Sequence, residues 1–576
     1  MACSFGTTLY RSCPTPPRPE LWPARPRRRL CMSSSVRIVV PPPPVITSYD
    51  VLRKYIRQPS MPHPFKEDEE GNKRREYLLE ETARTLRRSS KPPLETLKLI
   101  DTIQRLGIAY YLDDEITALL QNQFSLAGED DDLIATALRF RLLRHNGFPA
   151  AADVFLKFMD ERGKFKELSM PEGGLGLLSL YEASYTGARG EETIMEEAKV
   201  FSRARLQQWL PQLPQQLRQA AAQALAVPTH RRMARLEARR YIQEYGGGNR
   251  ELIELAVLDY NRVQAQHQME LTELTRWWKQ LGLVEKLPFA RDRPLECFLW
   301  SVGLLPEPKY STCRIELAKT IAVLLVIDDV FDTYGKMDDL LLFTDVIKRW
   351  DLAAIETLPE YMKICYMALY NTTNEICYKV LKENGWSVLP YLKSTWIDMI
   401  EGFMREAKWF NGGRPPNLDE YVENGVSTAG AYMALVHLFF LIGEGINEAN
   451  AQLLTKPYPK LFTAAGQILR LWDDLGTAKE EQERGDFASS IHLYMKEKNL
   501  GSEEEGRSRI LEKINNLWKD LNGEVMYNHT RMPLPIIKVA LNMARAAQVV
   551  YNHDQHTYFS SVDNYVEALF FTPLAI

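Results

Sequence analysis

Residues 94–120 read LETLKLIDTIQRLGIAYYLDDEITALL, and this stretch decides the fold class. Its apolar residues recur mostly at three-residue steps, a spacing that places side chains on one face of a helix; they are Leu94, Leu97, Ile100, Ile103, Leu106 and Ile108. Similar patterns dominate the chain from about residue 49 onward, whereas the period-two alternation of strands is scarce. The sequence therefore predicts an all-α body.

The length of 576 residues exceeds what one hydrophobic core supports, so at least two domains are expected. The run GGGN at residues 246–249 separates two helical patterns and marks the best boundary. We expect an N-terminal helical domain over residues 41–247 and a C-terminal one over 248–576.

Residues 1–40 have the composition of an organelle transit peptide. They carry seven arginines, several serines and prolines, and a single acidic residue, Glu20. The run PPPP at residues 41–44 is typical of a stiff spacer before the folded body. The alternative is a basic tail without a targeting role.

The bulk composition excludes several classes of protein. A net charge of −4 with 25% charged residues indicates neither a nucleic-acid nor an anionic-membrane partner. The apolar run Ile321–Ile327 is far shorter than the roughly 20 residues of a membrane helix. The seven cysteines are scattered, which argues against a disulfide framework or a zinc site.

An acidic cluster follows a wholly apolar helical pattern in residues 320–335, TIAVLLVIDDVFDTYG. On a helix Asp328 and Asp332 share a face, and Asp329 is rotated by about 100°. Carboxylate oxygens are ligands that magnesium prefers. The bare motif is expected about once by chance in so acidic a chain, so a solvated acidic face is the alternative.

A second oxygen-rich row lies in residues 468–486, ILRLWDDLGTAKEEQERGD. Asp473, Thr477 and Glu481 follow at intervals of four, which aligns them along one helix face. Two such rows indicate several magnesium ions and, with them, a diphosphate. Arg291 and Arg293 in FARDRPLECFLW, together with Arg470, are candidate phosphate ligands, with surface salt bridges as the alternative.

The chain resembles plant terpene synthases through three motifs in the family order: RDR at 291–293, DDVFD at 328–332 and DDLGTAKEE at 473–481. The resemblance extends over nearly all of the body, including ATALRFRLLRHNGF at 135–148 and SVDNYVEALFFTP at 561–573. It implies two α-helical barrel-like domains: an inert N-terminal domain, and a C-terminal domain with the class I terpenoid synthase fold.

The resemblance also implies a lyase that uses three Mg²⁺ ions, or Mn²⁺, to ionise a prenyl diphosphate in a plastid. Asp328 and Asp332 are the expected catalytic pair. The implied metal ligands are Asp328, Asp332, Asp473, Thr477 and Glu481. The implied diphosphate ligands are Arg291, Arg293, Asp328, Asp332, Arg470 and Asp473.

Four secondary expectations follow. Asp329 is expected to act behind the metal ligands, and the segment VSTAGAYMALVH at 426–437 to contain a break in a helix. Trp300, Tyr551 and Tyr558 are candidates to line the cavity, although core packing explains each equally well. The acidic run Glu129–Asp132 resembles a protonation motif, but it precedes a helical pattern and predicts a helix start.

The product is suggested by a missing motif. Many cyclising relatives have two arginines followed by eight residues and a tryptophan, and no Arg-Arg pair here has that spacing. In the family this absence is typical of acyclic products, so we expect geranyl diphosphate to give linalool, with farnesyl diphosphate to nerolidol as a second activity.

Other readings stay open. Geraniol, myrcene, ocimene or a cyclic terpene are alternative products, and a prenyl chain-elongating transferase is a rival enzyme class. The non-enzymatic alternative is a helical interaction scaffold. No obligate protein partner is inferred, and the enantiomer and oligomeric state stay open.

Overall fold

The computed structural model describes most of the body of the chain. The described residues are 69–88, 93–125, 132–169, 173–244, 248–412, 414–484, 489–527, 531–552 and 564–575. The predicted leader at 1–40, the proline run at 41–44, Tyr558 and two of the boundary glycines lie outside them.

Helices form all the regular structure of the described part, where a single isolated bridge between Met159 and Phe165 is the only β-type pairing. This confirms the all-α prediction. The N-terminal helices are α2 (Glu69–Arg87), α3 (Pro93–Arg105), α4 (Asp113–Ser125), α5 (Leu133–His145), α6 (Gly173–Ser184), α7 (Glu192–Trp209), α8 (Gln215–Ala226) and α9 (Ala234–Glu244).

The remaining helices form the larger, C-terminal part of the fold. They are α10 (Arg250–Leu281), α11 (Leu283–Lys286), α12 (Pro294–Leu304), α13 (Ser311–Asp329), α14 (Met337–Arg349), α15 (Glu360–Asn384), α16 (Leu389–Gly412), α17 (Leu418–Thr428), α18 (Ala431–Ile442), α19 (Glu448–Gln452), α20 (Lys460–Arg484), α21 (Ser490–Lys498), α22 (Glu503–Tyr527) and α23 (Leu534–Tyr551).

Short turns of tighter or wider helix connect these elements. The 3₁₀ turns are η1 (Ala109–Tyr111), η2 (Ala152–Phe158), η3 (Leu210–Gln212), η4 (Thr229–Arg231), η5 (Pro308–Tyr310) and η7 (Leu352–Thr357), and the π-helical turns are η6 (Val330–Tyr334) and η8 (Glu567–Phe571).

The stretch at residues 94–120 folds as α3 and α4, with a sharp turn between them. Leu97, Ile100 and Ile103 are completely buried, as their spacing predicts. Gly107 has a φ of +76°, a conformation that L side chains rarely adopt, and a Cβ there would lie 2.9 Å from Ala238 Cβ. The glycine therefore lets α3 end against α9.

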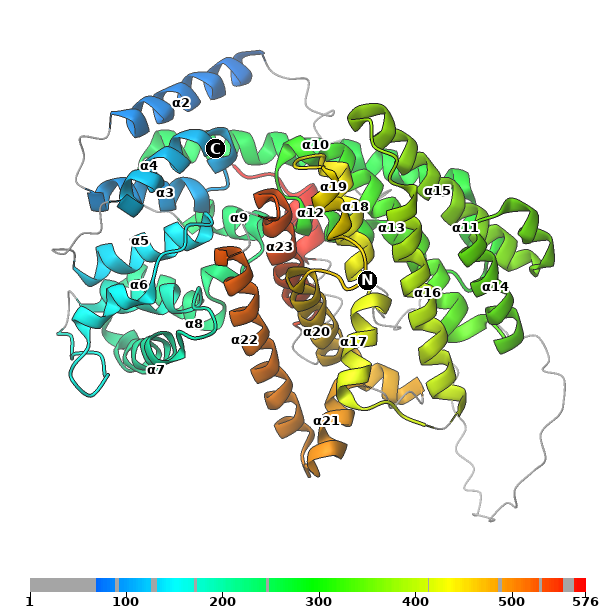
Figure 1. Cartoon of the computed structure of the whole chain (residues 1–576). Coiled ribbons are helices and arrows are strands. Elements are labelled where there is room, and N and C mark those ends of the chain that lie inside the picture. Colours follow the sequence, from blue (N-terminus) through cyan, green and yellow to red (C-terminus); the bar gives the residue numbers. More distant parts are fainter. Residues whose placement is uncertain are drawn as a thin grey trace, which may run out of the picture.

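Two hydrophobic cores share the long helix α10, which runs between the two groups of helices in Figure 1. Leu255 and Tyr260 in its first half pack into the core of the N-terminal helices. Leu274 and Trp278 in its second half pack into the core of the C-terminal helices. The helix after the predicted boundary thus contributes to both cores.

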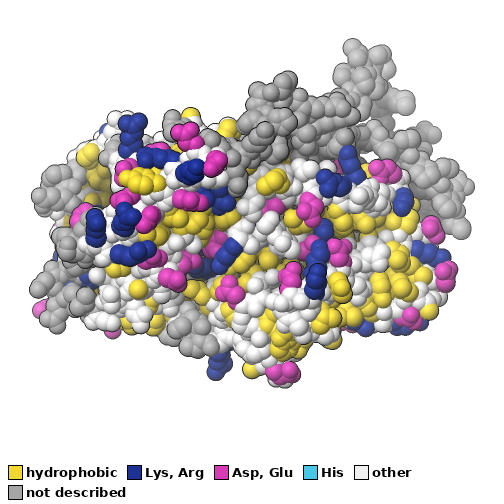
Figure 2. All heavy atoms as spheres, turned by 90° about the horizontal axis from the view of Figure 1, so that it is seen from above, with side chains coloured by type: hydrophobic (Ala, Val, Ile, Leu, Met, Phe, Trp, Pro, Cys, Tyr) yellow, Lys and Arg dark blue, Asp and Glu magenta, His cyan; other side chains and the backbone are white. Residues whose placement is uncertain are grey.

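Polar contacts also join the two groups of helices. Asn522 on α22 donates to the carbonyl oxygens of Tyr185 and Gly187, at 3.0 and 2.9 Å. Its Oδ1 lies 2.8 Å from His230 Nε2. On the face shown in Figure 2, cationic and anionic side chains are interspersed, without one continuous patch of either sign.

The helical run Leu418–Ile442 has the length and composition of a membrane helix, but 78% of its most apolar window is buried inside the protein. Core helices of globular proteins show the same combination, so the run is weak evidence for a membrane span.

A buried ion pair anchors α13 to α10. Arg314 has no exposed surface and donates to both carboxylate oxygens of Glu270, at 2.8 and 2.6 Å. Its Nη1 donates to the backbone carbonyl of Leu305 at 2.9 Å. Because the pair is fully desolvated, removing one partner leaves an uncompensated charge.

We expect Arg314→Met to lower the free energy of unfolding by about 3–5 kcal/mol, measured by urea denaturation. The double variant Arg314→Met/Glu270→Gln should recover part of the loss, because no carboxylate is then left unpaired. Arg276→Met, at an exposed position of α10, is the matched control. Equal stability of Arg314→Met and Arg276→Met would contradict the assignment.

Candidate active site

The first acidic cluster lies at the C-terminal end of α13, a helix that is buried from Cys313 to its last residues, Asp328 and Asp329. These aspartates are only 3% and 6% exposed. Burial raises the pKa of Asp329 to about 6, although the adjacent Arg291 opposes the shift. The expectation that the cluster ends a buried helix is confirmed.

The local geometry differs from the prediction at Asp332. The α-helix ends at Asp329, and Val330–Tyr334 form a π-helical turn. Asp328 and Asp332 are therefore not related by a regular α-helical turn. Wider turns of this kind are frequent at functional sites, because they redirect a side chain from the helix face.

Asp332 is accessible to solvent, yet it is surrounded by protein and other carboxylates. Lost hydration and the like charges of Asp328 and Glu406 raise its pKa. It makes no hydrogen bond or ion pair to any other described residue. An added cation would relieve this repulsion.

Arg291 joins the two aspartates of α13. Its Nη2 lies 2.5 Å from Asp328 Oδ2, and its Nε lies 2.6 Å from Asp329 Oδ1. The backbone N–H of Arg291 also donates to Asp329 Oδ2 at 3.0 Å. Asp329 thus contacts Arg291 twice. These contacts agree with the expectation that Asp329 acts behind the metal ligands.

The other charged residues of the RDR motif have separate partners. Arg293 pairs with Glu296 one turn later, at 2.9 Å. Asp292 accepts a hydrogen bond of 2.9 Å from Trp278 Nε1. The motif therefore presents Arg291 and Arg293 to different neighbours instead of along one line.

The second row lies on α20. Asp473 and Thr477 are each 1% exposed, and the Thr477 hydroxyl donates to the carbonyl oxygen of Asp473 at 2.9 Å. Arg470 lies 3.7 Å from Asp473 and 3.1 Å from Asp474. The backbone of Glu481 continues this helix, but its side chain lies outside the described residues.

Asp474 and Tyr421 fix the arginine of this row. The Tyr421 hydroxyl donates to Asp474 at 2.9 Å and contacts Arg470. The other oxygen of Asp474 accepts from the backbone N–H of Ser490 at 2.9 Å. Asp474 is thereby a structural carboxylate beside the predicted ligand Asp473.

Glu406 on α16 is a site residue that sequence reasoning missed. It accepts hydrogen bonds from Thr428 Oγ1 at 2.8 Å and Asn424 Nδ2 at 2.9 Å. Burial raises the pKa of Glu406, Arg470 opposes the shift, and Asp328 adds to it. Glu406 thus interacts electrostatically with groups of both rows. The sequence around it is an ordinary helical pattern, so no local signal indicates that Glu406 belongs to the site.

The predicted helix break is confirmed beside Glu406. Helix α17 ends at Thr428, and α18 begins at Ala431. Gly430 between them has a φ of +72°, a left-handed conformation that glycine adopts without strain. The break places the Thr428 hydroxyl on the Glu406 carboxylate.

The remaining secondary expectations have mixed outcomes. Trp300 and Tyr551 are buried, and their ring centroids lie 6.0 Å apart, which agrees with core packing. Asp132 accepts from the backbone N–H of Ala135 at 2.8 Å and caps α5, so the predicted helix start is confirmed. Glu129, Asp130 and Asp131 lie outside the described residues.

The donor chemistry of the two rows fits magnesium. The candidates are carboxylates and a hydroxyl, which are hard oxygen ligands. Within the part of the chain that the structure describes, no three acidic, histidine or cysteine side chains already lie close enough to hold an ion. The accessible, repelled carboxylate of Asp332 is nevertheless the group that a divalent cation would stabilise.

Comparisons with known proteins agree with this arrangement. The model of the "Terpene synthase, N-terminal domain" matches residues 50–225, and that of the "Terpene synthase family, metal binding domain" matches residues 279–520. The chain is 65% identical to monoterpene synthase TPS4, chloroplastic, of Cananga odorata, over 92% of this chain and 90% of that protein.

Two further relatives come from Ocimum basilicum. The chain is 63% identical to its chloroplastic geraniol synthase, over 99% of this chain and 100% of that protein. It is 64% identical to its chloroplastic R-linalool synthase, over 88% of each chain.

A solved structure supports the same family. Isoprene synthase from grey poplar leaves (Populus x canescens), in complex with three Mg²⁺ ions and dimethylallyl-S-thiolodiphosphate, superposes with a TM-score of 0.81. It is 37% identical and covers 88% of this chain and 97% of its own. Its fold and the family models agree, and the chain belongs to the terpene synthase family, lyases that act on prenyl diphosphates.

Proposed function

We propose that this chain ionises geranyl diphosphate and adds water to the uncyclised allylic cation, which gives an acyclic monoterpene alcohol, linalool. The C–O bond to the diphosphate breaks, and the diphosphate keeps the electron pair. A water oxygen then bonds to the tertiary carbon and loses a proton. The missing Arg-Arg-tryptophan motif and the identity to R-linalool synthase support this product.

Geraniol is the second candidate, in which water adds to the primary carbon of the same cation. The geraniol synthase relative favours it, because that match extends over essentially the whole of both chains. Both alcohols share the ionisation step and differ only in the carbon that water reaches. Farnesyl diphosphate to nerolidol is proposed as a second activity of the same site.

The observation that carries the proposal is the convergence of charge around Glu406. Asp328 raises the pKa of Glu406 and Arg470 lowers it, and Glu406 in turn raises the pKa of Asp332. We propose Asp328, Asp332, Asp473, Thr477 and Glu481 as the magnesium ligands. When bound, the metal ions neutralise the diphosphate as it leaves.

The arginines complete the proposed diphosphate site. Arg291 and Arg470 are held at the inner ends of the two rows by carboxylates. A planar guanidinium donates two parallel hydrogen bonds, which suits phosphate oxygens. Arg293, paired with Glu296 nearby, is proposed as the third contact.

We also propose residues 1–40 as a plastid leader, 41–247 as an inert domain and 248–576 as the catalytic domain. The chloroplastic relatives support the location. The gap between the two family matches, residues 226–278, contains the proposed boundary.

We expect Asp328→Ala and Asp473→Ala each to lower turnover of geranyl diphosphate by about a hundredfold or more, because each removes charge stabilisation of the leaving group. Diphosphate release with magnesium measures the effect, and circular dichroism checks the fold. Asp338→Ala, an exposed acid in the first turn of α14, is the matched control. Near-normal activity of either variant would remove that residue from the ligand set.

Arg470 offers a test that leaves every charge in place. A Cβ on Gly425 would lie 2.6 Å from Arg470 Cγ, so Gly425→Ala must displace the arginine side chain. We expect kcat/KM for geranyl diphosphate to fall by about 10- to 100-fold, because misplacing a binding group by about 1 Å has effects of this size.

The control for this variant is Gly412→Ala, where a Cβ meets no atom within 4 Å. Activity of Gly425→Ala equal to that of Gly412→Ala would mean that the position of Arg470 has no part in turnover.

The product is tested by gas chromatography of volatiles formed from geranyl diphosphate and magnesium in ¹⁸O-labelled water. We expect an acyclic alcohol that carries the label, because water attacks carbon. A cyclic terpene as the main product overturns the acyclic proposal, and an unlabelled alcohol overturns water capture. Inactivity with both geranyl and farnesyl diphosphate would contradict the proposed ionisation and favour the alternative of a helical interaction scaffold.

A further inference from the structure

A cavity of about 270 Å³, with many charged side chains among its lining residues, lies where the N-terminal helices meet α22 and α23. Arg105 on α3 and His145 on α5 line one side, and Lys538 and Arg545 on α23 line the other. The residues of the two acidic rows are not among those that line it. The volume is slightly below that of pockets for drug-sized ligands, so a small ligand with water fits best.

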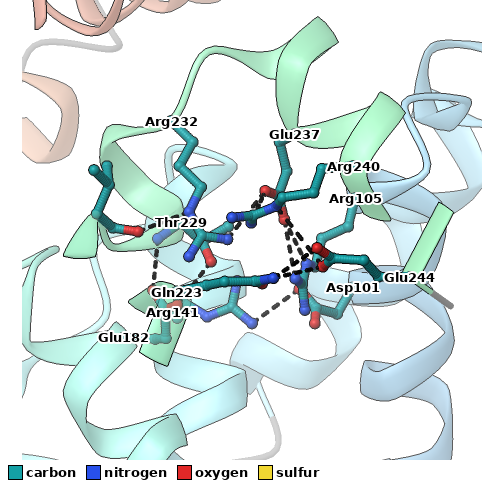
Figure 3. Close-up of polar contacts among 11 residues, drawn as sticks. Asp101, Arg105, Arg141, Glu182, Gln223, Thr229, Arg232, Glu237, Arg240 and Glu244 are labelled. Carbon is teal, nitrogen blue, oxygen red and sulfur yellow. Dashed lines mark hydrogen bonds and ion pairs between the residues drawn. The ribbon is translucent and has the colours of Figure 1, made fainter. Parts of the chain in front are cut away.

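Cationic groups outnumber anionic ones around this cavity, with seven lysine and arginine side chains against four carboxylates. Figure 3 shows one reason, because Glu237 is shared by three arginines. Arg105 lies 2.9 Å and Arg232 3.0 Å from its oxygens, and Arg240 contacts it as well. Arg240 does not line the cavity and also lies 4.0 Å from Glu244. The two lining arginines, Arg105 and Arg232, share the single charge of Glu237.

Two cations of α23 face the cavity without a carboxylate partner. Arg545 donates only to neutral oxygens, the carbonyl of His230 at 2.7 Å and Oδ1 of Asn542 at 2.8 Å. Burial lowers its pKa to about 10. Lys538, two turns earlier on the same helix face, makes no hydrogen bond or ion pair to the described residues. Both side chains are half-buried, and burying a cation without a counter-ion is costly, so an anion at this wall would be stabilising.

A pair of histidines adds a hydrogen-bond acceptor to the lining of the cavity. Asn522 donates its two amide hydrogens to carbonyls, so its Oδ1 must accept from His230 Nε2–H. His230 Nδ1 then accepts from His145 Nε2–H at 3.0 Å. The chain of bonds leaves Nδ1 of His145 as an acceptor on a residue that lines the cavity.

We propose that this interdomain cavity binds an inorganic phosphate-type anion, either free phosphate or diphosphate. Arg545 and Lys538 supply the charge and the donors for a multiply charged oxyanion, and the guanidinium fork matches its geometry. A hydrogen phosphate also carries an O–H that can donate to His145 Nδ1. Diphosphate is the coproduct of the proposed reaction, so binding of diphosphate rests on the proposed function, whereas binding of free phosphate does not.

Calorimetric titration of the full chain in excess EDTA tests the site without turnover, first with inorganic phosphate and then with diphosphate. We expect one site per chain, and affinity at least about tenfold weaker in Lys538→Gln and in Arg545→Gln, since each removes a charge-assisted contact. Lys538 makes no side-chain hydrogen bond or ion pair to the described residues, so Lys538→Gln should stay folded. It keeps the test valid if Arg545→Gln unfolds. Lys496→Gln, an exposed lysine of α21, is the matched control.

The variant Arg291→Gln distinguishes binding in the cavity from binding in the active site. It changes only the active site, so we expect it to bind both anions as the unmodified chain does. Tighter binding of diphosphate identifies the coproduct as the ligand, and tighter binding of phosphate identifies the free ion. The proposal fails if neither anion binds at millimolar concentration, if Lys538→Gln binds like Lys496→Gln, or if Arg291→Gln alone abolishes binding.

Discussion

The structure depends on keeping charged side chains inside an apolar helical core. Helix α13 is buried from Cys313 to its last residues, Asp328 and Asp329. Carboxylates there are stable only beside a cation, and Arg291 supplies it through contacts to both. At its other end, Arg314 and Glu270 solve the same problem between α13 and α10. The two ion pairs place α13, and with it the acidic cluster.

The site combines compensated and uncompensated charges. Asp329 and Asp474 each hold an arginine, whereas Asp332 is accessible and repelled by its neighbours. The arginines partly offset the hydration that Asp329 and Asp474 lose on burial. A carboxylate left exposed to such repulsion is stabilised by a divalent cation. Glu406 adds another carboxylate near the two rows, because its pKa responds to Asp328 of the first row and to Arg470 beside the second.

The contact between the two groups of helices follows the same electrostatics with the opposite sign. Among the residues that line the interdomain cavity, arginines outnumber carboxylates, and Arg545 donates its hydrogen bonds to neutral oxygens. Asn522 fixes the histidine pair and joins backbone carbonyls of the N-terminal part to α22. These contacts join the N-terminal helices to α22 and α23, along a wall that an anion would stabilise.

The sequence by itself determined the all-α class, the buried course of α13, the break near Gly430 and the two acidic rows, because helical periodicity and charge spacing are local properties. The π-helical turn that moves Asp332, the pairing of Arg291 with Asp328 and Asp329, and the part of Glu406 were decided by tertiary structure. So was the interdomain cavity, whose walls come from residues more than four hundred positions apart in the chain, such as Asp101 and Arg545. Contacts between distant segments depend on how helices pack, and no local pattern records that packing.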